Sequence, residues 1–310
     1  MTSAPLNSRK FAITIPCFKS EHTIAATLEG VMAQGDALQR VACVVLADDV
    51  TPDKTLAVAR SVWKLSDPPL KFENRRKNVG EMINVNTTVA GLPPQVEWFL
   101  HMHGDNIPKA GWLQTITDRC LQAAPNVGIV CASYDCLSDS GHITEGDELP
   151  SRPVELIKGD SASVRGTIHK GCWWHNSCGA IRVSAFREVG GLPPGMRQKG
   201  DWDFLLRLLH AGWDIEYIPR TLMLYRLHDN SASGFAFRIH LDIEESLQIV
   251  QKYSKLLSWV DIIRYHGSSG ITLARRVAGS AKRGDGLRAR KALRMQIRNW
   301  ASCISCLAAR

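Results

Sequence analysis

The sequence predicts an α/β protein in which a mixed, mostly parallel sheet is flanked by helices and followed by a helical extension. Three observations lead to this prediction. Short apolar runs alternate with helical patterns through residues 1–135, which is typical of parallel strands with covering helices. Of the 310 residues, 45% are hydrophobic and 22% are charged, so the chain can bury a large core. From about residue 235 the pattern is helical to the end.

The first 135 residues are expected to contain five strands with helices between them. Ser20 can cap a helix, an apolar stripe at helical spacing follows it, and Gly35 lies just after the stripe, which together predict the first helix. The expected strands are residues 11–16, 41–47, 70–73, 98–102 and 127–132, and the later helices are residues 55–65, 80–90 and 109–124.

Residues 136–176 are polar and rich in Gly, Ser and charged residues, which predicts a long loop of the kind that is usually functional or mobile. Strands at 179–183, 214–218 and 221–225 follow, with helices at 184–189 and up to His210. We therefore expect one domain over residues 1–235, with halves 1–135 and 136–235, and a helical extension over 236–310.

The net charge of +8 is concentrated in the tail. Of the 38 basic and 30 acidic residues, ten basic residues and one acidic residue fall in 271–310, which leaves 28 and 29 in the rest of the chain. The body is therefore close to neutral, and this distribution does not indicate a nucleic-acid-binding protein.

Two features of the sequence predict the cellular compartment of the protein. No apolar run approaches the roughly 18 residues of a membrane-spanning helix, and the run at residues 11–15 is too short for a signal-peptide core. The nine cysteines lie at scattered positions without a disulfide framework, as expected for reduced thiols. Both features predict a cytoplasmic protein.

Acidic residues follow two of the expected strands. Asp48 and Asp49 come after the second strand and Asp105 follows the fourth, and ligands of open α/β sheets bind beyond the carboxyl ends of the strands. Carboxylates there can accept hydrogen bonds from a nucleotide and coordinate Mg²⁺ or Mn²⁺. The alternative is that Asp48 and Asp53 only form turns and cap a helix. Two acidic turns at successive strand ends favour a binding site.

Asp201 and Asp203 bracket Trp202 at the start of an expected helix. A carboxylate there can act as a general base if a substrate proton is in reach, but the helix dipole favours an acidic residue at this place in any case. His228 follows the last strand, where a neutral imidazole can be a metal ligand.

Six short motifs occur in order along the chain. The first three are residues 13–20 together with 28–34, residues 47–55, and residues 78–80 together with Asn86. The last three are residues 98–106, residues 178–191 together with 200–203, and residues 225–231. From Phe11 to about Ser231 the series resembles, in matching order, the family 2 glycosyltransferases of the GT-A fold, whose sheet is Rossmann-like. Each motif is weak by itself, and the ordered set of six is strong.

The resemblance implies inverting transfer of a sugar from a nucleotide-diphosphate sugar to a hydroxyl of a glycan or lipid-linked acceptor. It implies Asp201 as general base and a divalent metal ion, Mn²⁺ or Mg²⁺, held by Asp105 and by His228 as second ligand. The residues that it places at the nucleotide sugar are Pro16, Phe18, Asp48, Asp49, Asn78, Gly80, His103 and Asp105. Those on the acceptor side are Trp173, Trp174, His175, Trp202 and Asp203.

Three positions depart from the family pattern. His103 replaces the first Asp of the DxD motif, Gly200 replaces the Glu of the ED motif, and Val85 replaces an Arg that often precedes Asn86. The retained Asp105 and Asp201 favour an active enzyme. The alternative is a catalytically silent GT-A domain that binds a sugar nucleotide or glycan, or that serves as an assembly partner. The aromatic pair Trp173–Trp174 can likewise stack on a sugar or form a buried packing cluster.

Residues 286–310 predict a basic amphipathic helix. Its apolar residues at helical spacing are Leu293, Ile297, Trp300, Ile304 and Leu307, and Arg290, Arg294 and Arg298 lie nearby. Such a helix can dock on an anionic membrane at its inner face, where lipid-linked acceptors reside, or it can pack on the catalytic domain. Cys303 and Cys306 form a lone CxxC, which is weak evidence for a zinc or redox site.

Overall fold

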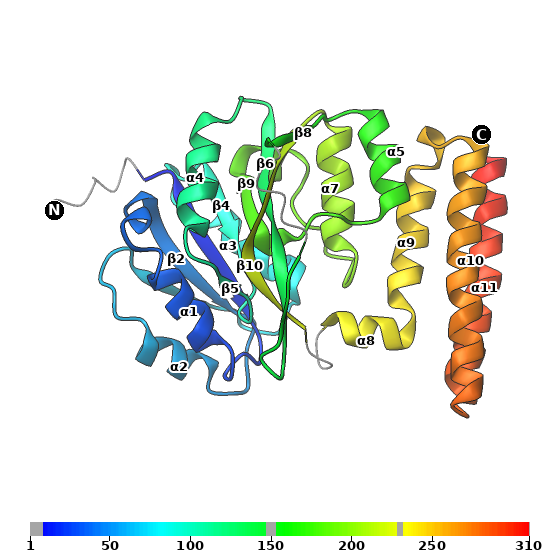
Figure 1. Ribbon diagram of the computed structural model, residues 1–310, viewed down its shortest axis with the longest axis horizontal. Helices are drawn as coiled ribbons and strands as arrows, with labels where there is room; N and C mark the ends of the chain where they lie inside the picture. The colour runs from blue at the N-terminus through cyan, green and yellow to red at the C-terminus, as the bar shows by residue number, and fades with distance from the viewer. Residues whose placement is uncertain (1–8, 147–152, 228–231, 310) are drawn as a thin grey trace. The chain divides into compact units, whose positions relative to one another are not determined.

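The computed structural model describes residues 9–146, 153–227 and 232–309 (Figure 1). The chain forms two compact units. The first comprises Met1–Asp160 and Trp174–Leu227, and the second comprises Ser161–Trp173 and His228–Arg310. The expected domain boundary near residue 235 stays a prediction, since compactness alone does not define a domain.

The first unit contains a ten-stranded sheet in the order β3-β2-β1-β4-β9-β6-β10-β5, with β7 paired to β6 and β8 paired to β10. The four strands β3, β2, β1 and β4 are parallel to their neighbours, and β6 is parallel to β10. Strand β9 is antiparallel to both β4 and β6. The strands are β1 (Phe11–Cys17), β2 (Val41–Asp48), β3 (Leu70–Asn74), β4 (Trp98–His101), β5 (Ile107–Pro108), β6 (Val127–Ser138), β7 (Ile143–Thr144), β8 (Glu155–Ile157), β9 (Gly179–Arg182) and β10 (Asp214–Leu227). This architecture confirms the predicted fold class.

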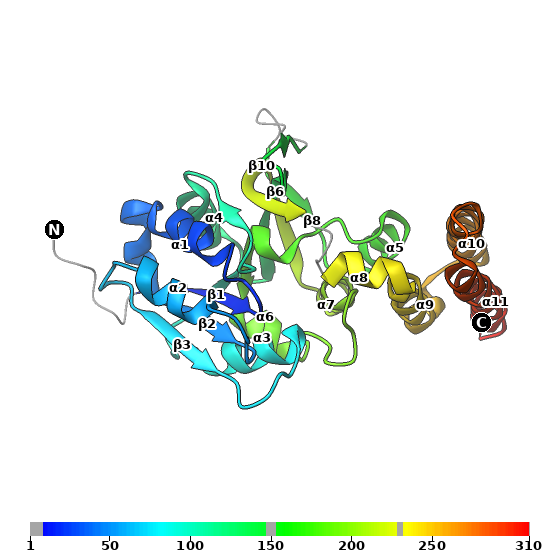
Figure 2. The same cartoon turned by 90° about the horizontal axis from the view of Figure 1, so that it is seen from below.

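Helices cover both faces of this sheet (Figures 1 and 2). On one face, Ile24 and Leu28 of α1 and Trp112 of α4 pack into a core with Ile13 and Ile15 of β1. On the other face lies α3, which packs against β1 and β2. The helices of the unit are α1 (Ile24–Met32), α2 (Thr55–Val62), α3 (Glu81–Ala90), α4 (Trp112–Gln122), α6 (Val183–Glu188) and α7 (Gly200–His210), with 3₁₀ turns η2 (Gly35–Arg40) and η3 (Asn176–Cys178).

Three local predictions were wrong. Ser20 does not cap α1 with its side chain: its carbonyl accepts bonds from the Thr23 and Ile24 N–H groups in a turn that precedes the helix. Residues 136–176 are not one long loop, because β6 extends to Ser138 and a helix, α5 (Ser161–Lys170), lies further along. The two strands expected at 214–225 are one strand, β10, whose register shifts between Ile218 and Thr221.

The second unit is helical throughout its described part. Its helices are α5, α8 (Ala232–Ile239), α9 (Leu241–Lys252), α10 (Trp259–Lys282) and α11 (Gly286–Ala308), with the 3₁₀ turn η4 (Ser254–Leu256). Helices α10 and α11 lie side by side (Figures 1 and 2) and share a buried hydrogen bond of 2.9 Å between His266 Nδ1 and Asn299 Oδ1. None of the described helices is long and apolar enough to cross a membrane.

Candidate functional site

Most of the predicted donor-side residues lie at one edge of the sheet. Asp48 is the last residue of β2 and His101 is the last residue of β4, and β1 lies between these two strands. Because the three strands are parallel, their carboxyl ends meet at the same edge, which His103 and Asp105 extend beyond β4. This is the edge where open α/β sheets bind ligands.

The acidic turn after β2 is held by hydrogen bonds within the protein. Asp49 is 4% exposed, and its carboxylate accepts bonds from the Val79 N–H at 2.7 Å and the Gly80 N–H at 2.8 Å. The Asn78 side chain donates to the Asp49 carbonyl at 3.0 Å. Gly80 has a φ of 81°, which a glycine adopts readily. Asp49 therefore fixes the 78–80 loop against the end of β2.

Asp48 and Asp53 have the turn-forming role that the sequence left open. Asp48 Oδ1 accepts a bond from the Thr51 N–H at 3.0 Å. Asp53 accepts bonds from the Thr51 hydroxyl, from the N–H and hydroxyl of Thr55 and from the Glu21 N–H. Burial acts to raise the pKa of Asp53, and these hydrogen bonds outweigh it, so the pKa is lowered. The turn is thereby tied to the loop after β1.

The two remaining donor-side residues, Pro16 and Phe18, lie at the end of β1 and in the loop that follows it. Pro16 is buried within β1, whereas the Phe18 side chain is 44% exposed just beyond the strand. The Lys19 N–H donates to the Thr51 hydroxyl at 2.7 Å, which joins this loop to the acidic turn. An exposed aromatic ring at the carboxyl edge is available to a ligand.

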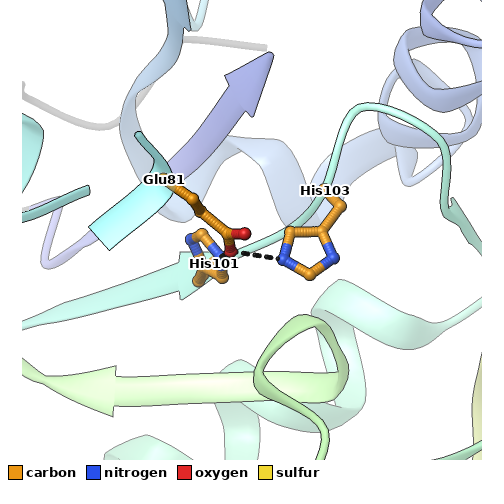
Figure 3. A group of neighbouring side chains, drawn as sticks. All are labelled: Glu81, His101 and His103. Atoms are coloured by element: carbon orange, nitrogen blue, oxygen red, sulfur yellow. Dashed lines mark hydrogen bonds and ion pairs between the residues drawn. The ribbon is translucent and has the colours of Figure 1, made fainter. Parts of the chain in front are cut away.

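A charged cluster lies where β4 ends (Figure 3). Glu81, the first residue of α3, places Oε1 2.8 Å from Nε2 of His103 and 3.8 Å from Nε2 of His101. Burial opposes the charged forms, but the Glu81 charge and hydrogen bond raise the pKa of His103 to about 9, and Asp105 and Asp201 add to this. The Glu81 pKa is held well below its ordinary value by the two histidines. Glu81 and His103 thus form an ion pair.

His101 differs from its neighbour in the cluster. It is 1% exposed, and burial is the main reason that its pKa is lowered. Its Nδ1 lies 3.5 Å from the Thr14 hydroxyl, while its Nε2 has no hydrogen-bond partner. Sequence reasoning missed both His101 and Glu81. The His-x-His pattern at a strand end and the acidic residue directly after Gly80 were the available signals.

Asp201 interacts electrostatically with the charged cluster at the end of β4. It lies in the first turn of α7, where Oδ1 accepts a bond from the Trp202 N–H at 2.8 Å. Burial raises its pKa, Glu81 acts in the same direction, and Lys199 and His103 oppose the rise. The structure therefore brings Asp105 and Asp201, which are far apart in sequence, within electrostatic reach of His103.

The residues expected on the acceptor side differ in burial and in the contacts that they make. Trp202 is buried, and Asp203 forms an ion pair of 2.7 Å with Arg207, whose guanidinium also donates to the Val189 and Gly191 carbonyls. Asp203 thus stabilises the turn before α7. Trp174 is buried with its ring centroid 5.9 Å from that of Phe204, so this tryptophan has the packing role considered as an alternative.

Trp173 and His175 complete the acceptor-side group. Trp173 belongs to the second unit and donates from Nε1 to the Thr167 hydroxyl at 3.1 Å. His175 belongs to the first unit, with ring centroids 4.3 Å from Tyr225 and 5.8 Å from His103. Burial, together with the charge of His103, lowers the pKa of His175 to about 3, so its imidazole is neutral at pH 7. His228, the expected second metal ligand, lies outside the described residues.

Comparison with known proteins identifies the family. The model of the family described as glycosyl transferase family 2 matches residues 12–190, which include the acidic turn, Glu81 and the cluster after β4. The chain belongs to this family. It is accordingly a glycosyltransferase, and its sheet with flanking helices is the GT-A fold.

Three relatives of this glycosyltransferase are informative. The succinoglycan biosynthesis protein ExoA of Rhizobium meliloti (strain 1021) is 24% identical over 229 residues, which are 73% of this chain and 66% of ExoA. The mannosyltransferase PcManGT of Pyrobaculum calidifontis, solved with GDP-Man and Mn²⁺, is similar at a TM-score of 0.61 and 15% identity, over 96% of this chain and 86% of the other. S. aureus TarS 1–349, solved with UDP-GlcNAc, is similar at a TM-score of 0.58 and 13% identity. The match covers 91% of this chain and 90% of the TarS chain.

Proposed function

We propose that the protein transfers a sugar, with inversion, from a nucleotide-diphosphate sugar to a hydroxyl of a glycan or lipid-linked acceptor, with Asp201 as the general base. One observation carries this proposal. Asp201, on α7, and Asp105, after β4, both act on the charge of His103 at the carboxyl edge of the sheet. One site can therefore hold a donor at the strand ends and a base beside it.

The donor side of the site is the carboxyl edge of β1, β2 and β4. We assign the nucleotide to the exposed ring of Phe18 and to the turn of Asp48 and Asp49, and we assign the diphosphate and sugar to the side of His103 and Asp105. The Asp49 carboxylate already accepts two backbone bonds, so its role is to fix the loop of Asn78 and Gly80. When no metal ion is bound, the positive His103 imidazolium favours a diphosphate at this place, and an ion that displaces its proton would supply the positive charge instead.

The chemical step follows from the position and burial of Asp201. Its carboxylate accepts the proton of the acceptor hydroxyl while that oxygen attacks the anomeric carbon, and the bond from this carbon to the diphosphate oxygen breaks. Burial raises the pKa of Asp201, which makes the carboxylate a stronger base than an exposed aspartate. Single displacement needs no nucleophile from the protein.

The donor set around His103 fits a divalent metal ion. The Glu81 carboxylate and the imidazoles of His101 and His103 meet there, and the buried His101 Nε2 has no hydrogen-bond partner. A bound Mn²⁺ or Mg²⁺ would neutralise negative charge on the departing diphosphate. Asp105 would hold this ion, with His228 as the second ligand expected from the sequence. PcManGT, which has the same fold, was solved with Mn²⁺.

The substrate classes are supported by the relatives. TarS was solved with UDP-GlcNAc and PcManGT with GDP-Man, so two proteins with this fold bind a nucleotide-diphosphate sugar, which supports this donor class. ExoA is a succinoglycan biosynthesis protein. We therefore assign this chain to the biosynthesis of a bacterial-type surface polysaccharide or glycolipid in the cytoplasm.

We further propose that the α10–α11 hairpin contacts the inner face of an anionic membrane. On α11, Leu293, Ile297, Trp300 and Ile304 are exposed at helical spacing. A Cβ on Gly270 of α10 would lie 3.4 Å from Trp300, so this tryptophan lies against α10, on which Val260, Ile263 and Ile271 are also exposed. The exposed cations Arg290, Lys291 and Arg294 favour anionic lipid as the occupant.

Vesicle binding tests the membrane proposal. The protein should sediment with vesicles that contain phosphatidylglycerol and not with pure phosphatidylcholine vesicles. Because burying one isoleucine contributes about 1.5 kcal/mol or more, Ile297→Glu should weaken binding at least about tenfold, whereas Leu121→Glu, at an exposed site on α4, should not. A dimer that Ile297→Glu dissociates would instead show a protein contact and contradict the proposal.

Nucleotide release tests the proposed reaction. Wild-type protein should release nucleotide from one member of a panel of sugar nucleotides with Mn²⁺ or Mg²⁺, and chelation with EDTA should stop the release. Asp201→Asn and Asp105→Ala should abolish release, and nuclear magnetic resonance of the product should show the inverted anomer. Donor binding without turnover by any acceptor in a glycan and lipid panel would favour the silent binding domain instead.

A further inference from the structure

We propose that Glu81, His101 and His103 together bind one divalent transition-metal ion in preference to Mg²⁺. These three side chains, drawn in Figure 3, differ from the Asp105 and His228 pair expected from the sequence. The set supplies two imidazole nitrogens and one carboxylate oxygen.

The distances already approach those of a coordination shell. The three donor atoms lie within 4.8 Å of one another, and the two distances to Glu81 Oε1 are 2.8 Å and 3.8 Å. With metal–ligand bonds of about 2.1 Å, neighbouring ligands around a tetrahedral or octahedral ion are separated by about 3.0 to 3.4 Å. Small side-chain rotations therefore suffice to enclose an ion.

The buried Nε2 of His101 indicates that a ligand binds next to it. A buried polar atom normally has a hydrogen-bond partner, because leaving it without one costs about 1 to 3 kcal/mol. His101 is 1% exposed, yet its Nε2 has no such partner and faces Glu81 at 3.8 Å. A metal ion between these two groups and His103 would satisfy the nitrogen.

Each ligand is held on a rigid element. His101 ends the central strand β4, and its Nδ1 lies beside the Thr14 hydroxyl of β1. The His103 N–H donates to the Ser177 hydroxyl at 3.2 Å. Glu81 begins α3 directly after Gly80, whose N–H is fixed by Asp49. The backbone at all three positions is therefore in place before an ion binds.

The donor types decide which metal is preferred. Imidazole nitrogen suits Fe²⁺, Co²⁺, Ni²⁺ and Zn²⁺, whereas Mg²⁺ prefers an all-oxygen octahedral shell that includes several waters. Three protein ligands leave coordination positions open, as in catalytic rather than structural metal sites. That these positions take diphosphate oxygens rests on the proposed function, but the binding of the ion does not.

Metal titration of tag-free, EDTA-stripped protein in the absence of donor tests the site. We expect one Co²⁺ per chain by visible absorption and elemental analysis, and an affinity for Mg²⁺, by calorimetry, at least about tenfold weaker. Glu81→Gln and His103→Asn change side chains that are only partly buried, and they should weaken Co²⁺ binding at least about tenfold. His142→Asn removes an exposed imidazole elsewhere and should leave it unchanged.

The outcomes separate this site from the enzymatic proposal. Folding of each variant is checked by circular dichroism, and His101→Asn is interpreted only if it folds. Unchanged Co²⁺ affinity in folded Glu81→Gln and His103→Asn, or no Co²⁺ binding by the wild type, would overturn the inference even if a donor is turned over. Binding of one Co²⁺ through these residues supports the inference even if no donor is turned over.

Discussion

Gly200 and Met82 are in such close contact that a side chain fits at position 200 only if the Met82 side chain moves. A Cβ atom on Gly200 would lie 2.7 Å from the sulfur of Met82, closer than carbon and sulfur atoms approach. Gly200 begins α7 and Met82 is the second residue of α3, so the amino-terminal ends of the two helices meet here. The residues beside this contact are Glu81 and Asp201. The contact therefore sets the position of the base relative to the charged cluster.

Gly200→Ala should destabilise the protein by about 1 to 3 kcal/mol, because the added methyl group overpacks the contact. Met82→Ala removes the sulfur and should cost about 2 kcal/mol by leaving a cavity. The double variant should be more stable than the sum of the two changes by about 1 kcal/mol, which urea unfolding measures. Additive effects would show that the two side chains do not compete for this space.

Asp201→Asn should lower kcat/KM by about 10²- to 10⁴-fold, since the amide cannot accept the acceptor proton. The donor dissociation constant and the unfolding midpoint should stay unchanged. Asp36→Asn, at an exposed position in η2, is the matched control. Activity of folded Asp201→Asn within about tenfold of wild type would mean that another group is the base.

Asp49→Ala should cost about 3 kcal/mol of stability and weaken donor binding, because the Val79 and Gly80 N–H groups lose their acceptor. Asp49→Asn keeps one acceptor oxygen and should lose about half of that free energy. Urea unfolding and calorimetric donor titration give the two quantities. If Asp49→Ala abolished donor binding without a loss of stability, Asp49 would contact the nucleotide directly.

The pKa of His175 predicts a loss of stability on the acid side. The pKa of about 3 in the folded state lies below the ordinary 6.5, so between these values the unfolded chain binds a proton that the folded chain does not. Stability should therefore fall as pH decreases from 6.5 toward 3, and His175→Gln should make this slope shallower. Urea unfolding of EDTA-treated protein across this range measures the slope. Parallel slopes for wild type and His175→Gln would contradict the prediction, and His142→Gln is the control.

The sheet was predictable because its signal is local. Buried strands such as 11–16 and 41–47 are continuous apolar runs, and the structure extends each by one residue. Helix α5 was missed because its buried side chains, Val164, Thr167 and Ile168, alternate with Ser, Gly and Arg, which weakens the apolar period. The break expected between residues 218 and 221 contains Pro219, whose missing N–H interrupts the ladder, and the register shifts there without ending the strand.

The site was predictable at the level of strand ends and not at the level of contacts. Asp48, Asp49 and Asp105 follow strands that are evident in the sequence. That Asp49 accepts bonds from Val79 and Gly80, or that Glu81 pairs with His103, depends on how α3 docks on the sheet. Such distances are set by packing between segments and leave no periodic trace in the sequence.

The direction of β9 has a consequence for how this enzyme can diversify. Because β9 is antiparallel to β4, the segment that enters β9 arrives at the edge where β4 ends, which places His175 and Ser177 beside His103. The chain between Ser138 and Trp173 lies upstream of this entry point. An insertion in that chain would leave the pairing of β9 with β4 and β6 unchanged, so His175 and Ser177 would stay beside His103. The antiparallel strand thus makes the position of these two residues independent of the length of the chain before them.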